Sequence, residues 1–228
     1  MSDPKIWNNR NLNKLNSNRY FPSEMILRAV FSNKYFNNII KNKIGSKILD
    51  VGCLFANNLV PFSDRGYELY GTEVTDEGVE IALDSMINQK IEVKVVKGFN
   101  TDLPFKSNFF EIVLSIATIH YEENIKNINK AFFEFARVLK KDGSLILKTV
   151  APKHEMYVNS RRLEKNLFIL DYETDLRHNQ RFFFFENEIE LKEIAEKYFE
   201  IVDIARITES YPKLTLDFYL ISCYKPKI

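Results

Sequence analysis

Short apolar runs alternate along this chain with longer segments whose apolar residues recur every three or four positions. The short runs are typical of β-strands, and the recurring pattern is that of helices with one buried face. The clearest stripe, within 123–139, consists of Ile125, Ile128, Ala131, Phe132, Phe135, Ala136 and Leu139. The expected strands are 47–51, 67–73, 91–97, 110–115, 143–150, 200–206 and 214–223, and the expected helices between them are 57–65, 76–87, 123–139 and 187–198. This alternation predicts an α/β fold with a mostly parallel sheet and helices on both faces.

The two ends of the pattern differ from its middle. The segment Phe21-Pro22-Ser23-Glu24 predicts a helix start, because proline and acidic residues are favoured in a first turn. We therefore expect residues 1–45 to form an N-terminal helical cover and residues 46–228 to form the main domain. The last two strands are joined by a short link around Tyr211-Pro212-Lys213. They must be antiparallel, because a parallel pair needs a crossover of a dozen or more residues.

Composition narrows the class of protein. The 228 residues are 45% apolar and 28% charged, which suits one globular domain with a sizeable core. The net charge of +1 lacks the basic excess of a nucleic-acid-binding protein. No apolar run approaches the roughly 18 residues that span a bilayer, so we expect no membrane partner. Cys53 and Cys223 form no disulfide framework and the three histidines no metal-ligand spacing, so a reducing, cytoplasmic setting is expected.

The candidate chemistry begins where the first expected strand ends. That strand runs into Asp50-Val51-Gly52, and the next one ends in Glu73, 21 residues past Gly52. A glycine here lets the backbone approach a ligand closely, and the acid can accept hydrogen bonds from two ribose hydroxyls. Both features are typical of a nucleotide-cofactor site.

Several further segments follow in a fixed order, and together they resemble the class I S-adenosylmethionine-dependent methyltransferases of the bacterial small-molecule type. The matching segments are Lys47 to Cys53, Gly66 to Glu73, Gly98 to Phe105, Phe110 to Ser115 and Ala136 to Ile146. The chain departs from the family at three positions. Leu54 and Ala56 stand where the second and third glycines of the loop would be, and Phe99 replaces the usual adenine-binding aspartate.

The resemblance implies a fold and a cofactor. The fold is a Rossmann-like, seven-stranded, mostly parallel sheet with an antiparallel last strand and helices on both faces. The cofactor is S-adenosyl-L-methionine, which leaves as S-adenosyl-L-homocysteine. The residues implied in holding it are Asp50, Gly52, Cys53, Leu54, Glu73, Val74, Asn100, Thr101, Ser115 and Ile116.

The acceptor side is assigned from position. His120 follows the fourth strand, at the carboxyl edge of the sheet, where a neutral imidazole suits a general base; the alternative is a structural histidine. Tyr121 and His154 are candidates for the same pocket. Residues 151–185 form a long insertion, the place of a substrate lid, with Arg177 and Arg181 as candidates for binding a phosphate or carboxylate. Because acids are interspersed there, a mixed solvated surface remains the other interpretation.

Three functions remain open. The first is methyl transfer to an oxygen or nitrogen of a small acceptor, with a saccharide or nucleotide-linked precursor as the candidate. The second is a catalytically inactive methyltransferase-like fold that acts as a binding or partner subunit, motivated by Leu54, Ala56 and Phe99. The third is a nicotinamide-binding oxidoreductase, which the antiparallel final strands oppose. Nucleic-acid acceptors are not expected, because Ser115-Ile116-Ala117-Thr118 lacks the motif of DNA amino-methyltransferases. The acceptor's identity and the oligomeric state stay open.

Overall fold

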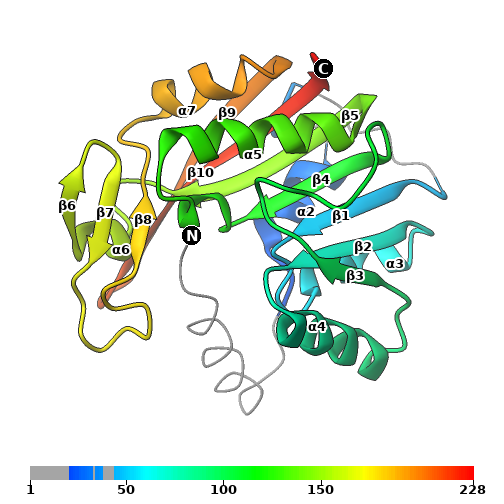
Figure 1. The fold of residues 1–228 in the computed structure, drawn as a ribbon, viewed down its shortest axis with the longest axis horizontal. Coiled ribbons are helices and arrows are strands. Elements are labelled where there is room, and N and C mark those ends of the chain that lie inside the picture. The colour runs from blue at the N-terminus through cyan, green and yellow to red at the C-terminus, as the bar shows by residue number, and fades with distance from the viewer. Residues whose placement is uncertain (1–20, 33, 38–43) are drawn as a thin grey trace.

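The computed structural model describes residues 21–32, 34–37 and 44–228. Its large sheet consists of β1 (Lys47–Val51), β2 (Glu68–Glu73), β3 (Lys94–Lys97), β4 (Phe110–Ile116), β5 (Leu139–Val150), β9 (Phe199–Ser210) and β10 (Thr215–Pro226). The seven strands lie in the order β3-β2-β1-β4-β5-β10-β9, from bottom to top in Figure 1. The first five are parallel, and β10 is antiparallel to both of its neighbours. The predicted fold class, a mostly parallel sheet with an antiparallel last strand, is therefore confirmed.

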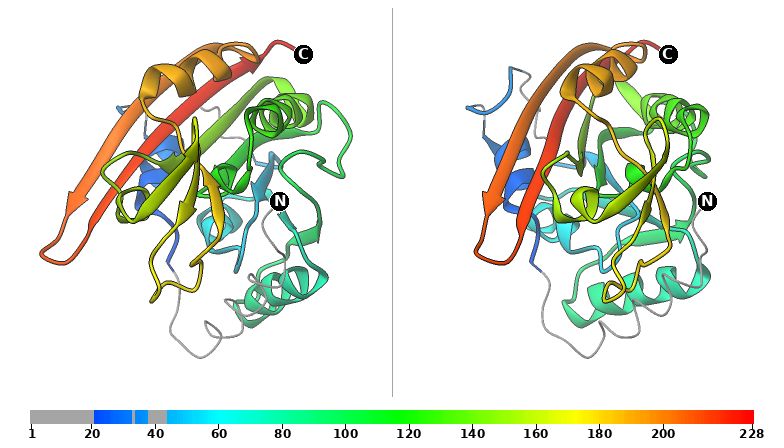
Figure 2. Two further views of the ribbon diagram at one scale, coloured as in Figure 1. Left: turned by 60° about the vertical axis from the view of Figure 1, so that its left-hand side comes forward. Right: turned by 90° about the vertical axis from the view of Figure 1, so that its left-hand side faces the viewer.

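The turn between the last two strands is tight. The Tyr211 amide donates to the Leu214 carbonyl oxygen over 2.9 Å, at the predicted link. From this turn β9 and β10 run side by side as a long hairpin that extends past the rest of the sheet (Figure 2).

Helices cover both faces of the sheet. They are α2 (Glu24–Phe31), α3 (Val60–Ser63), α4 (Asp76–Asn88), α5 (Ile125–Val138) and α7 (Glu188–Ala195). In β1, Leu49 packs under α5 and α7, whereas its neighbour Ile48 packs under α2, α3 and α4. Successive residues of a strand point to opposite faces. Because both faces are covered, apolar residues such as Ile48 and Leu49 follow one another in the strand and do not alternate with polar ones.

The predicted helix at 57–65 is shorter and irregular. It consists of the 3₁₀ turn η1 (Asn57–Leu59) followed by α3, with Pro61 in the first turn of α3. Proline fits a first turn but supplies no amide hydrogen, so a helix that continued through it from Asn57 would lack a backbone hydrogen bond. The predicted strand 91–97 begins only at Lys94.

The insertion at 151–185 contains structure that the sequence pattern did not predict. It contains α6 (Glu155–Val158), β6 (Ser160–Glu164) and β7 (Leu167–Leu170), and with β8 (Arg181–Phe183) the last two form a separate three-stranded antiparallel sheet. We call residues 151–185 the lid. Phe182 and Phe184 pack inside the lid, whereas Phe183 and Phe185 pack into the main core. This alternation joins the lid to the domain through buried aromatic side chains.

The N-terminal cover is described from Phe21 onward, and residues 1–20 lie outside the described part. Helix α2 buries Ile26, Ala29 and Val30 in the cluster that contains the sheet residue Ile48. Within the described residues no helix has the length and apolarity to cross a membrane, and no group of side chains forms a metal site.

The start of the lid is fixed to the sheet by the buried carboxylate of Asp217 on β10. It accepts hydrogen bonds from the Arg206 guanidinium at 2.7 and 3.0 Å, from the Thr208 hydroxyl at 2.7 Å and from the Lys153 amide at 2.8 Å. Burial alone would raise the pKa of Asp217, but these hydrogen bonds outweigh it and lower the pKa to about 2.

We predict that Asp217→Asn lowers the free energy of unfolding by about 1.5–3 kcal/mol at pH 7, because charge-assisted hydrogen bonds are lost. The folded-state pKa lies below the ordinary value, so this stabilisation is complete above pH 4 and fades as the pH falls towards 2. Urea unfolding at a series of pH values measures the difference, with the exposed Asp84→Asn as control. A gap that persists unchanged to pH 2 would contradict this account.

Candidate functional site

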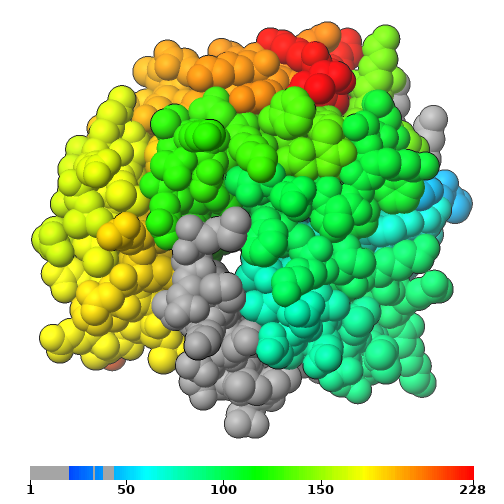
Figure 3. Space-filling model, viewed as in Figure 1, coloured from blue at the N-terminus to red at the C-terminus, as the bar shows by residue number. Residues whose placement is uncertain are grey.

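A cleft of about 460 Å³ opens at the carboxyl ends of the parallel strands. Its wall is formed by the loops after β1, β2, β3 and β4, by the end of β5, and by the lid. Ligands bind at this edge in open α/β sheets. In Figure 3 the lid forms the yellow flank of the molecule, and α4 lies on the opposite, green flank.

The loop after β1 is left-handed at three positions, of which only the first is a glycine. Gly52, Leu54 and Ala56 have φ values of +68°, +53° and +57°. A side chain at Gly52 is excluded, because its Cβ would lie 2.6 Å from the Thr118 methyl carbon. Leu54 and Ala56 carry side chains in the left-handed conformation, at a cost of about 1–2 kcal/mol per residue. The Leu54 side chain lies in the cleft wall, and Ala56 is fully buried.

Glu73, at the end of β2, holds this loop. Its carboxylate accepts a hydrogen bond of 2.5 Å from the Leu54 amide and a weaker one of 3.4 Å from the Val74 amide. Burial raises the pKa of Glu73, and these two hydrogen bonds oppose the rise. Glu73 therefore presents a partly desolvated carboxyl group in the cleft wall.

Asp50 lies behind the cleft wall. Its buried carboxyl accepts a hydrogen bond of 3.4 Å from Asn58, whose side-chain oxygen accepts one of 3.1 Å from the Ser23 amide. Burial raises the pKa of Asp50 to about 7. The chain of contacts links the first strand to the start of α2, and Ser23 itself lines the cleft.

The loops after β3 and β4 meet at a second buried acid. The Asn100 amide nitrogen donates to Glu122 over 3.2 Å and to the Thr118 carbonyl oxygen over 3.4 Å. Burial raises the pKa of Glu122, and the hydrogen bond from Asn100 opposes the rise. His120 is buried beside these residues in η2 (Ile119–Tyr121), with its ring centroid 5.9 Å from that of Phe182 in the lid.

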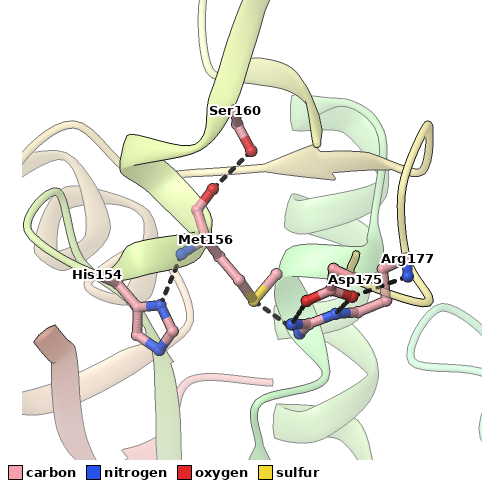
Figure 4. Close-up of polar contacts among 5 residues, drawn as sticks. All are labelled: His154, Met156, Ser160, Asp175 and Arg177. Atoms are coloured by element: carbon pink, nitrogen blue, oxygen red, sulfur yellow. Dashed lines mark hydrogen bonds and ion pairs between the residues drawn. The ribbon is translucent and has the colours of Figure 1, made fainter. Parts of the chain in front are cut away.

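At the lid end, His154 caps α6, and its Nδ1 accepts a hydrogen bond of 3.0 Å from the Met156 amide (Figure 4). Nδ1 therefore carries no proton, and Nε2 carries the hydrogen of the neutral ring. Burial and the charge of Arg177 lower the pKa of His154 to about 4. Arg177 is bound by Asp175, and its Nη1 lies 2.8 Å from the Met156 sulfur, a weak acceptor.

Lys148 adds a cation to this end of the cleft. It lies on β5 with its ammonium 4.5 Å from the centroid of the Phe218 ring, which also packs against His154. Burial lowers the pKa of Lys148. The lid end is thus rich in hydrogen-bond donors, whereas Glu73 and Glu122 make the other end acidic.

The cleft brings most of the residues predicted from the sequence together. Those in its wall are Gly52, Cys53, Leu54, Glu73, Val74, Asn100, Ile116, His120, Tyr121, His154 and Arg177. Four are not in the wall. The side chains of Asp50, Thr101 and Ser115 are buried, and Arg181 is exposed on β8.

Sequence reasoning missed several wall residues, among them Glu122, Lys148 and Phe218. Two left a signal. Lys148 is the one charge in the apolar run 145–150, and Glu122 directly follows His120 and Tyr121. Phe218 left none, because an aromatic residue in a strand is ordinary.

Comparison with known proteins agrees with this architecture. A family model described as a methyltransferase domain matches residues 49–147. A S-adenosylmethionine-dependent methyltransferase structure from Methanosarcina mazei superposes with a TM-score of 0.66 at 18% identity, over 90% of this chain and 99% of the other. Residues 49–147 thus match a methyltransferase domain, and the whole sheet has the fold of known methyltransferases. The match and the shared fold agree with the predicted family, enzyme class and cofactor, S-adenosylmethionine.

Two further methyltransferases extend the comparison. The structure of 1,6-didemethyltoxoflavin-N1-methyltransferase from Burkholderia thailandensis, with its substrate and S-adenosylhomocysteine bound, has a TM-score of 0.59 at 18% identity, over 80% of this chain and 72% of the other. Sterol 4-C-methyltransferase strm-1 of Caenorhabditis elegans is 24% identical over 166 residues, 72% of this chain and 47% of the relative. The chain spans about half the length of the curated relatives it matches.

The geometry of His154 predicts its titration. We expect a pKa of about 4 by NMR and, at neutral pH, a ring with its hydrogen on Nε2, because Nδ1 accepts from Met156. The folded-state pKa lies below the unfolded one, so this group opposes folding increasingly as the pH falls from 6.5 to 4. Assignment uses His154→Gln, which removes one resonance. A pKa near 6.5 would contradict the buried, hydrogen-bonded position.

Proposed function

We propose that this methyltransferase domain transfers the methyl group of S-adenosylmethionine to an oxygen or nitrogen atom of a small acceptor. The observation that carries the proposal is one continuous cleft, which extends from the loop after β1 to His154 and Arg177 of the lid. Cofactor and acceptor therefore share one enclosed space, as direct transfer between them requires.

The residues at the β1 end fit the cofactor. When bound, S-adenosylmethionine supplies a sulfonium methyl group that an acceptor lone pair can attack. Glu73 and Glu122 give this end of the cleft a negative potential, which favours a ligand with a positive sulfonium and ammonium group. In this proposal Glu73 accepts hydrogen bonds from the ribose hydroxyls, and the backbone at Gly52 to Leu54 meets the methionyl part.

The acceptor occupies the lid end. His120 is our candidate for the base that takes the proton from the acceptor hydroxyl or amine, and Tyr121 lies in the wall beside it. The unprotonated Nδ1 of the neutral His154 ring is occupied by the Met156 amide, so His154 offers a hydrogen bond from Nε2 and is not the base. Lys148 and Arg177 supply further donors, so acceptors with oxygen-rich groups are favoured, and saccharides and nucleotide-linked precursors belong in the first screen. A cytoplasmic location remains part of this proposal.

The cofactor assignment is tested by Glu73→Gln. We expect calorimetric titration to show that affinity for S-adenosylhomocysteine falls at least about tenfold, because the amide replaces a charged acceptor with a weaker one. The exposed Glu80→Gln on α4 should bind as the wild type does. If Glu73→Gln binds normally, Glu73 is a structural carboxylate. If the wild type itself does not bind, the inactive-fold alternative gains support.

The role of His120 is tested with an acceptor found by screening for S-adenosylhomocysteine release. His120→Ala and the closer mimic His120→Gln should lower turnover at least about tenfold, because a general base is lost, while cofactor binding is retained. The pH–rate profile should also lose its acid limb. His178→Ala, in the lid but outside the cleft wall, is the matched control. Unchanged turnover in both His120 variants would remove His120 from the mechanism.

A further inference from the structure

Two buried oxygen atoms at the acidic end of the cleft receive no hydrogen bond from any residue that the structure describes. They are Oδ1 of Asn100 and Oε2 of Glu122, and both residues line the cleft. Their partner atoms are satisfied, since Asn100 Nδ2 donates to Glu122 Oε1 over 3.2 Å. A buried acceptor without a donor is unfavourable, so two adjacent ones indicate a site whose donors come from a ligand.

The orientation of the Asn100 amide follows from its neighbours. Its nitrogen faces the Thr118 carbonyl oxygen and the Glu122 carboxyl group, both hydrogen-bond acceptors. The reversed amide would place oxygen against the Thr118 carbonyl oxygen, which is unfavourable. Oδ1 of Asn100 therefore points away from these two acceptors and can accept a hydrogen bond from a ligand. The loops after β3 and β4 thus present two acceptors, Asn100 Oδ1 and Glu122 Oε2.

The established cofactor carries a group with two matching hydrogens, the exocyclic amine of its adenine. In the nucleoside the base is joined directly to the ribose, so it must lie next to the residue that holds the ribose. Glu73 and the loop after β3 are adjacent, because the Gly98 amide donates to the Glu73 carbonyl oxygen over 2.9 Å. Phe99, in the same loop, lines the cleft and offers an apolar surface for the base.

We propose that Glu122, together with Asn100, accepts the two hydrogens of the adenine exocyclic amine and so selects adenine over other bases. Glu122 thereby takes over the role of the acid that Phe99 displaces. The proposal rests on the cofactor and not on the identity of the acceptor. If Glu122 and Asn100 bound the methionyl ammonium group instead, they would not discriminate between bases, because that group is the same in both ligands.

The test compares two ligands that differ at this amine. S-inosylhomocysteine carries an oxygen in its place and keeps the ribose and the amino-acid part of S-adenosylhomocysteine. Calorimetric titration of the full wild-type chain should give at least about tenfold weaker binding of the inosine analogue, because a site built to accept hydrogen bonds rejects an acceptor. Equal affinity of the two ligands for the wild type would overturn the proposal without any variant.

The Glu122→Gln variant should then weaken or remove the preference. Asn100 Nδ2 holds the new amide oxygen, so the new amide nitrogen faces the ligand and donates to the inosine oxygen. We expect the affinity ratio of the two ligands to shrink at least about tenfold, with affinity for S-adenosylhomocysteine reduced. Glu193→Gln, exposed on α7, should keep the wild-type ratio. A Glu122→Gln variant that loses both ligands equally would overturn the proposal, since a general disturbance of the cleft moves both alike.

Discussion

The left-handed turn after β1 determines where every other part of the cleft lies. It directs the chain from the end of a buried strand into η1 at the carboxyl edge of the sheet. Two non-glycine residues, Leu54 and Ala56, adopt it with φ values of +53° and +57°. The hydrogen bond from the Leu54 amide to Glu73 and that from the Ala56 amide to the Cys53 carbonyl oxygen, at 2.5 and 2.8 Å, hold it in place. The hydrogen bond to Glu73 on β2 thus offsets part of the conformational cost of the left-handed residues. The Glu73 carboxylate also lines the cleft.

The cleft is electrostatically divided. The carboxyl groups of Glu73 and Glu122 lie at the end proposed for the cofactor, and Lys148, His154 and Arg177 lie at the lid end, where Glu155 is the one acid in the wall among the described residues. This division matches a cofactor with a positive centre and an acceptor rich in oxygen. Two contacts fix the lid, and with it the donor groups, against the sheet. Asp217 binds the Lys153 amide at the start of the lid, and Phe182 to Phe185 alternate between the lid and the main core.

The central strands of the main sheet could be predicted because burial on both faces gives them runs of consecutive apolar residues, as in β4 and β5. The start of α7 could be predicted because Asn187 accepts from the Glu190 amide, a local interaction. The lid sheet could not, since β6 is largely exposed and carries no apolar pattern. At the site, the sequence predicted which segments lie at the cleft better than it predicted which way their side chains point. Ser115 lies at the cleft edge, yet its hydroxyl bonds to Thr118 and stays buried.

A crystal structure of the chain with S-adenosylhomocysteine would test the central claim most directly, namely that the cofactor loop forms with Leu54 and Ala56 in place of its second and third glycines. The account predicts the ligand in this cleft, its ribose on Glu73, and Leu54 and Ala56 still at positive φ. A loop that refolds to negative φ on binding, or a ligand bound elsewhere, would contradict it.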